Sequence, residues 1–315
     1  MRRFSLLISL LAIFYFSCAT DSPAPKYKTK NVVIIIMDGP RYSETWGDST
    51  HQYIPMETKY MKPEGLIFTH FYNLGPTYTD AGHTEITTGF KQEIENTGKQ
   101  LPEYPGIFQY FLKAYHFDST RAWVITSKDK LQVLANCKES AWHNQYMPAT
   151  NCGKNGNGTG YRDDSTTFRV VMNTLKTNHP NLMIVNFKQP DAAGHQANWQ
   201  AYLNGIKATD NYTYQIWQYL QTDPHYAGTA TFIYTNDHGR HCDGWKDGFV
   251  NHGDSCACCR HINLYMSGPD FKKNEIIGDP YEQTDIPFTV AELLGFKMEY
   301  GTGKVINAAF ARTGK

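Results

Sequence analysis

The sequence has no excess of charge of either sign, because 30 Lys and Arg residues balance 30 Asp and Glu residues. This balance gives no indication of a nucleic-acid polymer or an anionic membrane as a partner. It also lacks internal repeats and long low-complexity segments, which argues against a solenoid or an extended linker. Its 315 residues, 41% hydrophobic and 19% charged, are typical of a globular protein with one large domain.

Hydrophobic runs of membrane-spanning length are missing as well. The run Phe4–Phe16 has thirteen residues, fewer than the about 20 that a spanning helix needs. Two arginines precede it and a polar, proline-containing stretch follows, as in an export signal. We therefore expect a signal peptide over residues 1–17, a polar tether over 18–30 and a hydrolase domain over 31–315.

The dipeptide Ser17-Cys18 at the end of this run resembles a bacterial lipoprotein signal. We predict that Cys18 carries a lipid anchor, that this anchor is the only membrane contact, and that the protein lies in the bacterial periplasm or at the cell surface. Plain secretion and an uncleaved anchor are the alternatives.

Six cysteines remain beyond Cys18, and an even number in an exported protein favours disulfides. Cys137 and Cys152 are the natural pair because they are isolated from the others. The remaining four cluster late in the chain, and their pairing cannot be read: Cys242, Cys256, Cys258 and Cys259. A structural zinc is the alternative for this cluster.

Apolar, β-branched runs alternate with helical patterns along the chain. Strands are predicted over residues 31–37, 121–126, 182–187, 230–235 and 262–266. Helices are predicted over residues 81–88, 105–115, 163–177, 199–220 and 285–294. This alternation indicates an α/β domain with a central, largely parallel sheet flanked by helices.

Three aspartates directly follow predicted strands: Asp38, Asp191 and Asp237. The carboxyl ends of strands are where open α/β sheets hold their active sites. Asp191 and His195, completed by His252, would supply three ligands to one metal. Asp237 and His238, joined by Asp38, would supply three to another. Two metals about 3.5–4 Å apart can hold the attacking and leaving oxygens during displacement at phosphorus.

Thr79 is the proposed nucleophile and an additional metal ligand. A free threonine hydroxyl is a poor nucleophile at neutral pH, so metal coordination must activate it. Its place just before a predicted helix also directs backbone N–H groups towards a phosphoryl oxygen.

These motifs, in this order, resemble the alkaline phosphatase superfamily, and most closely its type I phosphodiesterase, nucleotide pyrophosphatase and phosphonoacetate hydrolase branch. They are MDG at Asp38, the Thr79 segment ending in Thr88-Gly89, PDAAGH at Asp191, NDHG at Asp237 and NHG at His252. The resemblance implies an alkaline-phosphatase-like domain and two Zn²⁺ ions, with Mn²⁺ or Fe possible. It also favours Thr79 over Thr77 as nucleophile.

Lys128 and Lys130 resemble the lysines that contact the anionic group of the substrate in the phosphonoacetate hydrolase branch. Relatives commonly carry Asn three residues after the nucleophile, where this chain has Gly82. We therefore expect Lys128 or the backbone N–H of Gly82 to bind the phosphoryl oxygen instead. His83 is expected to be a packed core residue, and His241 and His261 to be structural.

Together these features predict an exported two-metal phosphoester hydrolase of the phosphomonoesterase kind, which forms a covalent phosphothreonine on Thr79. The predicted substrate is a small anionic phosphoester. A phosphodiesterase, nucleotide pyrophosphatase or phosphonate hydrolase is the alternative. Two further alternatives are a phospho-group transferase and a non-catalytic binding protein on the same fold.

Overall fold

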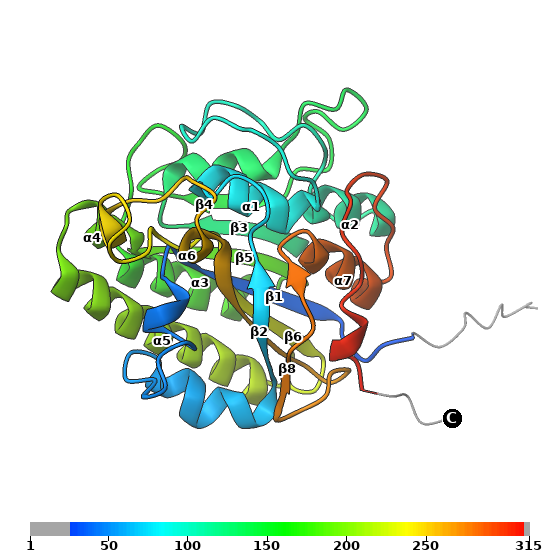
Figure 1. The fold of residues 1–315 in the computed structure, drawn as a ribbon. Helices are drawn as coiled ribbons and strands as arrows, with labels where there is room; N and C mark the ends of the chain where they lie inside the picture. The colour runs from blue at the N-terminus through cyan, green and yellow to red at the C-terminus, as the bar shows by residue number, and fades with distance from the viewer. Residues whose placement is uncertain (1–25, 312–315) are drawn as a thin grey trace, which may run out of the picture.

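The computed structural model describes residues 26–311, which fold around one nine-stranded sheet (Figure 1). Its strands are β1 (Asn31–Asp38), β2 (Leu66–Tyr72), β3 (Ala122–Thr126), β4 (Ala149–Cys152), β5 (Leu182–Pro190), β6 (Ala230–Asn236), β7 (His261–Ser267), β8 (Glu275–Ile277) and β9 (Tyr281–Glu282). Their order in the sheet is β4-β3-β5-β1-β6-β7-β2-β8, and β9 pairs with β2.

Strand β1 lies at the centre of the sheet, parallel to β5 on one side and to β6 on the other. All of its residues are buried, because helices cover both faces of the sheet. This is why its sequence reads as a continuous apolar run rather than an alternating one. The predicted α/β class with a largely parallel sheet is confirmed.

The helices are α1 (Thr79–Thr88), α2 (Ile107–Tyr115), α3 (Asp164–Asn178), α4 (Asp191–His195), α5 (Trp199–Thr222), α6 (Ala257–Arg260) and α7 (Asp285–Leu294). Shorter helical turns occur at Tyr42–Glu44, Glu57–Met61, Lys62–Glu64, Ser119–Arg121, Asp129–Ala135, Gly248–Val250 and Asn307–Ala309. Helices α1, α2 and α7 pack with Ile34 and Ile36 on one face of the sheet. Helices α3 and α5 pack with Val33 and Ile35 on the other face.

The main differences from expectation lie at one edge of the sheet. β7 runs antiparallel to both β6 and β2, so this edge is mixed. The strands β2, β4, β8 and β9 were not predicted. β2 mixes buried apolar residues with Thr69 and the exposed His70, and the other three are short.

The predicted signal peptide and the Cys18 anchor lie outside the described residues. Of the predicted tether, residues 26–30 already contact the domain. The backbone amides of Lys28 and Thr29 donate to the Asp270 carboxylate at 2.9 and 2.8 Å. Within residues 26–311, no helix combines the length and apolar character needed to cross a membrane.

The predicted pairing of Cys137 with Cys152 is wrong. Both thiols are free and buried in the same hydrophobic cluster, and the Cys152 Sγ faces the carbonyl of Val124 at 3.6 Å. The disulfide of the described residues instead joins Cys242 to Cys258, with Cα atoms 5.2 Å apart. Cys256 and Cys259 are free thiols.

Candidate active site

Three adjacent strands bring the predicted aspartates together. Asp38 ends β1, Asp191 begins α4 directly after β5, and Asp237 follows β6. Because β5, β1 and β6 are parallel neighbours, their carboxyl ends meet at one edge of the sheet. The three carboxylates are almost completely buried, and buried carboxylates of like charge need cations beside them.

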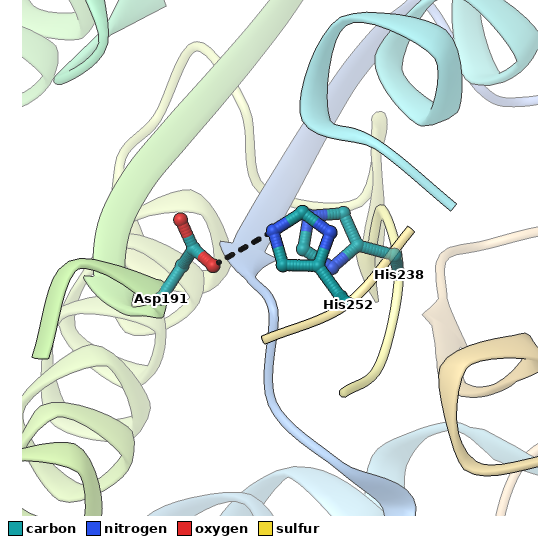
Figure 2. A group of neighbouring side chains, drawn as sticks. All are labelled: Asp191, His238 and His252. Atoms are coloured by element: carbon teal, nitrogen blue, oxygen red, sulfur yellow. Dashed lines mark ion pairs between the residues drawn. The ribbon is translucent and has the colours of Figure 1, made fainter. Parts of the chain in front are cut away.

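The first predicted ligand group forms a compact triangle. The His195 Nε2 lies 3.3 Å from Asp191 Oδ1 and 3.1 Å from His252 Nε2. The His252 Nε2 lies 3.4 Å from the same Asp191 oxygen (Figure 2). A tetrahedral zinc with bonds of about 2.0–2.1 Å separates its ligand atoms by about 3.3–3.4 Å. The triangle therefore has the dimensions of one face of a zinc site.

The second predicted group lies beside the first. The His238 Nε2 lies 3.4 Å from Asp237 Oδ2, 3.7 Å from Asp38 Oδ1 and 3.5 Å from Thr79 Oγ1. Figure 2 shows the rings of His238 and His252 stacked, with centroids 3.8 Å apart. The two imidazoles thus join the two ligand groups into one site.

Backbone carbonyls orient two of these imidazoles. The Nδ1 of His238 lies 2.8 Å from the carbonyl of Gly239, and the Nδ1 of His252 lies 2.7 Å from that of Thr77. Since a carbonyl only accepts, Nδ1 carries the proton and Nε2 presents its lone pair to the site, as metal-bound histidines do. Burial lowers the pKa of His238 to about 3, so its ring is neutral at physiological pH.

The Lys128 ammonium lies between the two groups. Its Nζ is 2.8 Å from Asp38 Oδ1, 2.7 Å from Asp191 Oδ2 and 3.0 Å from Thr79 Oγ1. Although burial opposes its charge, the carboxylates raise its pKa above the ordinary value, so Lys128 is charged. Lys128 therefore places a fixed positive charge against the proposed nucleophile.

The pKa values of the two carboxylates beside Lys128 shift in opposite directions. Burial and the neighbouring charge of Asp237 raise the pKa of Asp38 to about 7. The pKa of Asp191 is held well below its usual value: burial opposes this, but the Lys128 charge and hydrogen bonds from His195 and His252 prevail.

The residues present fit a pair of divalent cations. The Asp237 Oδ2 is buried and, within residues 26–311, has no hydrogen-bond partner, which is costly unless a cation binds it. Imidazole nitrogens and carboxylate oxygens are the donors that zinc takes in catalytic sites. Asp191, His195 and His252 would hold one ion, and Asp38, Asp237, His238 and Thr79 the other.

Residues 102–297, more than half of the chain, match the family model described as Metalloenzyme superfamily. The chain belongs to the Metalloenzyme superfamily. No curated protein sequence matches it.

Solved structures share the fold of this metalloenzyme. The phosphonate monoester hydrolase of Silicibacter pomeroyi is 12% identical with a TM-score of 0.64, over 90% of this chain and 78% of that one. Murine ectonucleotide pyrophosphatase/phosphodiesterase 5 is 14% identical with a TM-score of 0.63, over 87% and 97%. The alkaline phosphatase PafA is 13% identical with a TM-score of 0.67, over 90% and 99%.

The superfamily match and the shared fold confirm the resemblance to the alkaline phosphatase superfamily. The metalloenzyme is thus homologous to metal-dependent phosphoester hydrolases.

Thr79 is the first residue of α1, which begins two residues earlier than the predicted helix over 81–88. Its side chain faces Lys128 and His238, whereas the Thr77 hydroxyl donates to the carbonyl of Asp254 at 2.8 Å. His83, one turn later, is buried as expected. Its Nδ1 contacts the Thr79 carbonyl at 2.8 Å and Asp237 Oδ2 at 3.3 Å, so it also supports the ligand set of the metalloenzyme.

Two predicted substrate contacts are placed otherwise. The Gly82 N–H donates to the Tyr78 carbonyl at 2.8 Å inside the helix, so it is not free to bind a phosphoryl oxygen. A Cβ at Gly82 would lie 2.4 Å from the Asp237 carbonyl oxygen, so this position allows α1 to pack closely against the β6 end. The Lys130 ammonium pairs with Asp80 at 3.1 Å and donates to the Asn96 carbonyl at 3.2 Å, whereas Lys128 is the lysine that contacts Thr79.

Two supporting residues were missed. The buried Arg240 guanidinium donates to Asp191 Oδ1, and the Asn186 amide donates to Asp38 Oδ2 at 2.8 Å. Arg240 directly follows the Asp-His-Gly motif, and this position next to two predicted ligands could have indicated its role. Asn186 interrupts the otherwise apolar β5 run, where a polar side chain needs a buried partner.

Proposed function

We propose that this protein is an exported two-zinc phosphomonoesterase that acts through a phosphothreonine on Thr79. The observation that carries the proposal is the position of Lys128, whose buried ammonium lies 3.0 Å from Thr79 Oγ1. A phosphomonoester is largely a dianion at neutral pH, whereas a diester carries a single charge. A fixed cation at the nucleophile stabilises the more highly charged group.

In the proposed reaction, the Thr79 oxygen gives up its proton to solvent and bonds to phosphorus, while the bond from phosphorus to the leaving oxygen breaks and that oxygen takes up a proton from solvent to leave as the alcohol. Water then attacks the phosphothreonine, which releases phosphate and restores the Thr79 hydroxyl. When bound, the two metals supply activation of the hydroxyl and neutralisation of the leaving oxygen. Lys128 holds a phosphoryl oxygen throughout, and His83 and α1 keep Thr79 in position.

Two exposed aromatic side chains lie close to Thr79 and Lys128, namely Tyr78, the residue before Thr79, and Tyr161. The Lys128 Nζ lies 5.8 Å from the centre of the Tyr161 ring, and Tyr78 packs edge-on against His252. We propose that these rings flank the leaving group, which favours small alcohols or aryl groups over a polymer.

The experiment compares hydrolysis of matched aryl phosphomonoester and phosphodiester substrates by the zinc-loaded protein. Thr79→Ala is expected to abolish turnover, and Thr77→Ala, the matched control, to retain it. Preference for the diester would favour the phosphodiesterase alternative. Turnover that survives Thr79→Ala would refute the proposed nucleophile.

The export part of the proposal rests on residues 1–18. We propose that Cys18 is lipidated, so Cys18→Ser should release the protein from the membrane fraction of its host into the soluble fraction. If the variant stays with the membranes, the lipid anchor is refuted.

A further inference from the structure

A second group of metal-binding side chains lies in the segment between β6 and β7. A nitrogen of His241, a carboxylate oxygen of Asp254 and the Sγ of Cys259 all lie within 4.8 Å of one another. Cys256 lies next to them, since its Sγ accepts the backbone N–H of Cys259 at 3.4 Å. None of these residues belongs to the hydrolase ligand set.

His241 has the orientation of a metal-bound histidine. Its Nδ1 lies 2.6 Å from Asp247 Oδ1, so Nδ1 carries the proton and donates it in a hydrogen bond to the carboxylate. Its buried Nε2 has no hydrogen-bond partner in the part of the chain that the structure describes, although it points to Asp254 Oδ2 at 3.4 Å. Metal-ligating histidines characteristically give their other N–H to a carboxylate or carbonyl.

The Asp254 carboxylate is held in place but remains available. One oxygen, Oδ1, accepts the backbone N–H of Cys256 at 2.9 Å. The other, Oδ2, accepts from Trp245 Nε1 at 3.1 Å and from Lys246 Nζ at 2.7 Å. The Lys246 side chain is half exposed, so its ammonium can turn into solvent when another cation binds the carboxylate.

The two thiols stay reduced beside a disulfide. Cys242 and Cys258 pair with each other, which leaves Cys256 and Cys259 at a Cys-x-x-Cys spacing. The disulfide partners are the immediate neighbours of His241 and Cys259, so this bond fixes the separation of those two ligands. Two thiolates, one imidazole and one carboxylate form a four-ligand set suited to zinc.

We propose that His241, Asp254, Cys256 and Cys259 form a third, structural zinc site, separate from the hydrolase pair. On binding, the two thiols release their protons to solvent and their sulfurs bond to the metal. The site would hold the segment that carries His252. The Gly239 N–H donates to the Cys259 carbonyl at 2.8 Å, and the Asp254 carbonyl accepts the Thr77 hydroxyl.

The test measures bound zinc per chain after removal of loosely bound metal, in the wild type and in single-residue variants. We expect three equivalents in the wild type and two in Cys256→Ser, Cys259→Ser and His241→Ala. Cys137→Ala, which removes a free thiol elsewhere, should retain three.

A spectroscopic measurement tests the third site without relying on the hydrolase site or on the folding of the cysteine variants. Cobalt-substituted wild-type protein should show a thiolate-to-cobalt charge-transfer band. The band should survive Asp237→Asn, which affects only the hydrolase pair, and Cys137→Ala. Absence of the band, or a Cys256–Cys259 disulfide found by mass spectrometry of the native protein, would overturn the third site.

Discussion

Replacement of Lys128 by alanine should separate monoester from diester hydrolysis. The ammonium lies 3.0 Å from Thr79 Oγ1. An oxygen of a phosphoryl group attached to Thr79 would therefore lie within about 4 Å of the ammonium. At an effective dielectric constant of about 20, one unit of charge at about 4 Å is worth about 4 kcal/mol. A tenfold change in rate corresponds to about 1.4 kcal/mol, so the additional charge of a monoester is worth up to roughly a thousandfold.

We therefore expect Lys128→Ala to lower kcat/KM for an aryl phosphomonoester by about 100- to 1000-fold more than for the matched diester. Steady-state kinetics on both substrates measure the difference. Lys130→Ala is the matched control, because its ammonium pairs with Asp80 and not with Thr79. An equal loss on both substrates would refute a charge-selective role of Lys128.

Three further changes test other parts of the structure. Burial raises the pKa of Glu85 from 4.5 to about 8, so the folded state prefers the proton. Its stability should fall as pH rises from 4.5 towards 8, and Glu85→Gln should remove a penalty on the order of 4 kcal/mol at pH 8 in denaturant unfolding; an unchanged pH profile would contradict this. His252→Ala should cost one hydrolase zinc and at least about 100-fold in kcat/KM, and full zinc content in this variant would contradict its role as ligand. Gly82→Ala should cost about 1–3 kcal/mol, because its Cβ would meet the Asp237 carbonyl oxygen at 2.4 Å; an unchanged melting temperature would argue against that close packing.

The sheet centre was predictable because its strands are buried on both faces and leave uninterrupted apolar runs. β1, β5 and β6 were found in this way, with their ends within three residues of the predicted ones. The antiparallel edge left weaker signals, because its strands are short or mix exposed polar residues with buried ones. The direction of a strand depends on how the connecting segment returns to the sheet. The periodicity of hydrophobic residues does not encode that connection.

The structure also brings together ligand residues named from the sequence, because each follows a recognisable strand or motif. Contacts that depend on tertiary placement were harder to infer. Nothing local indicates that Gly82 packs on Asp237 or that Lys130 pairs with Asp80. The supposed pairing of Cys137 with Cys152 failed for the same reason, since isolation along the chain says nothing about distance in space.

The ligands of the hydrolase site are spread from Asp38, in the first strand, to His252, in the segment between β6 and α6. Neither metal group can therefore be completed by an isolated fragment, since each combines residues from distant segments. Metal capture would then report on completion of the whole fold: a truncated or partly unfolded chain would bind zinc weakly, and a fully folded one would be stabilised by it. Because the proposed activity needs both metals, its onset would coincide with the last stage of folding.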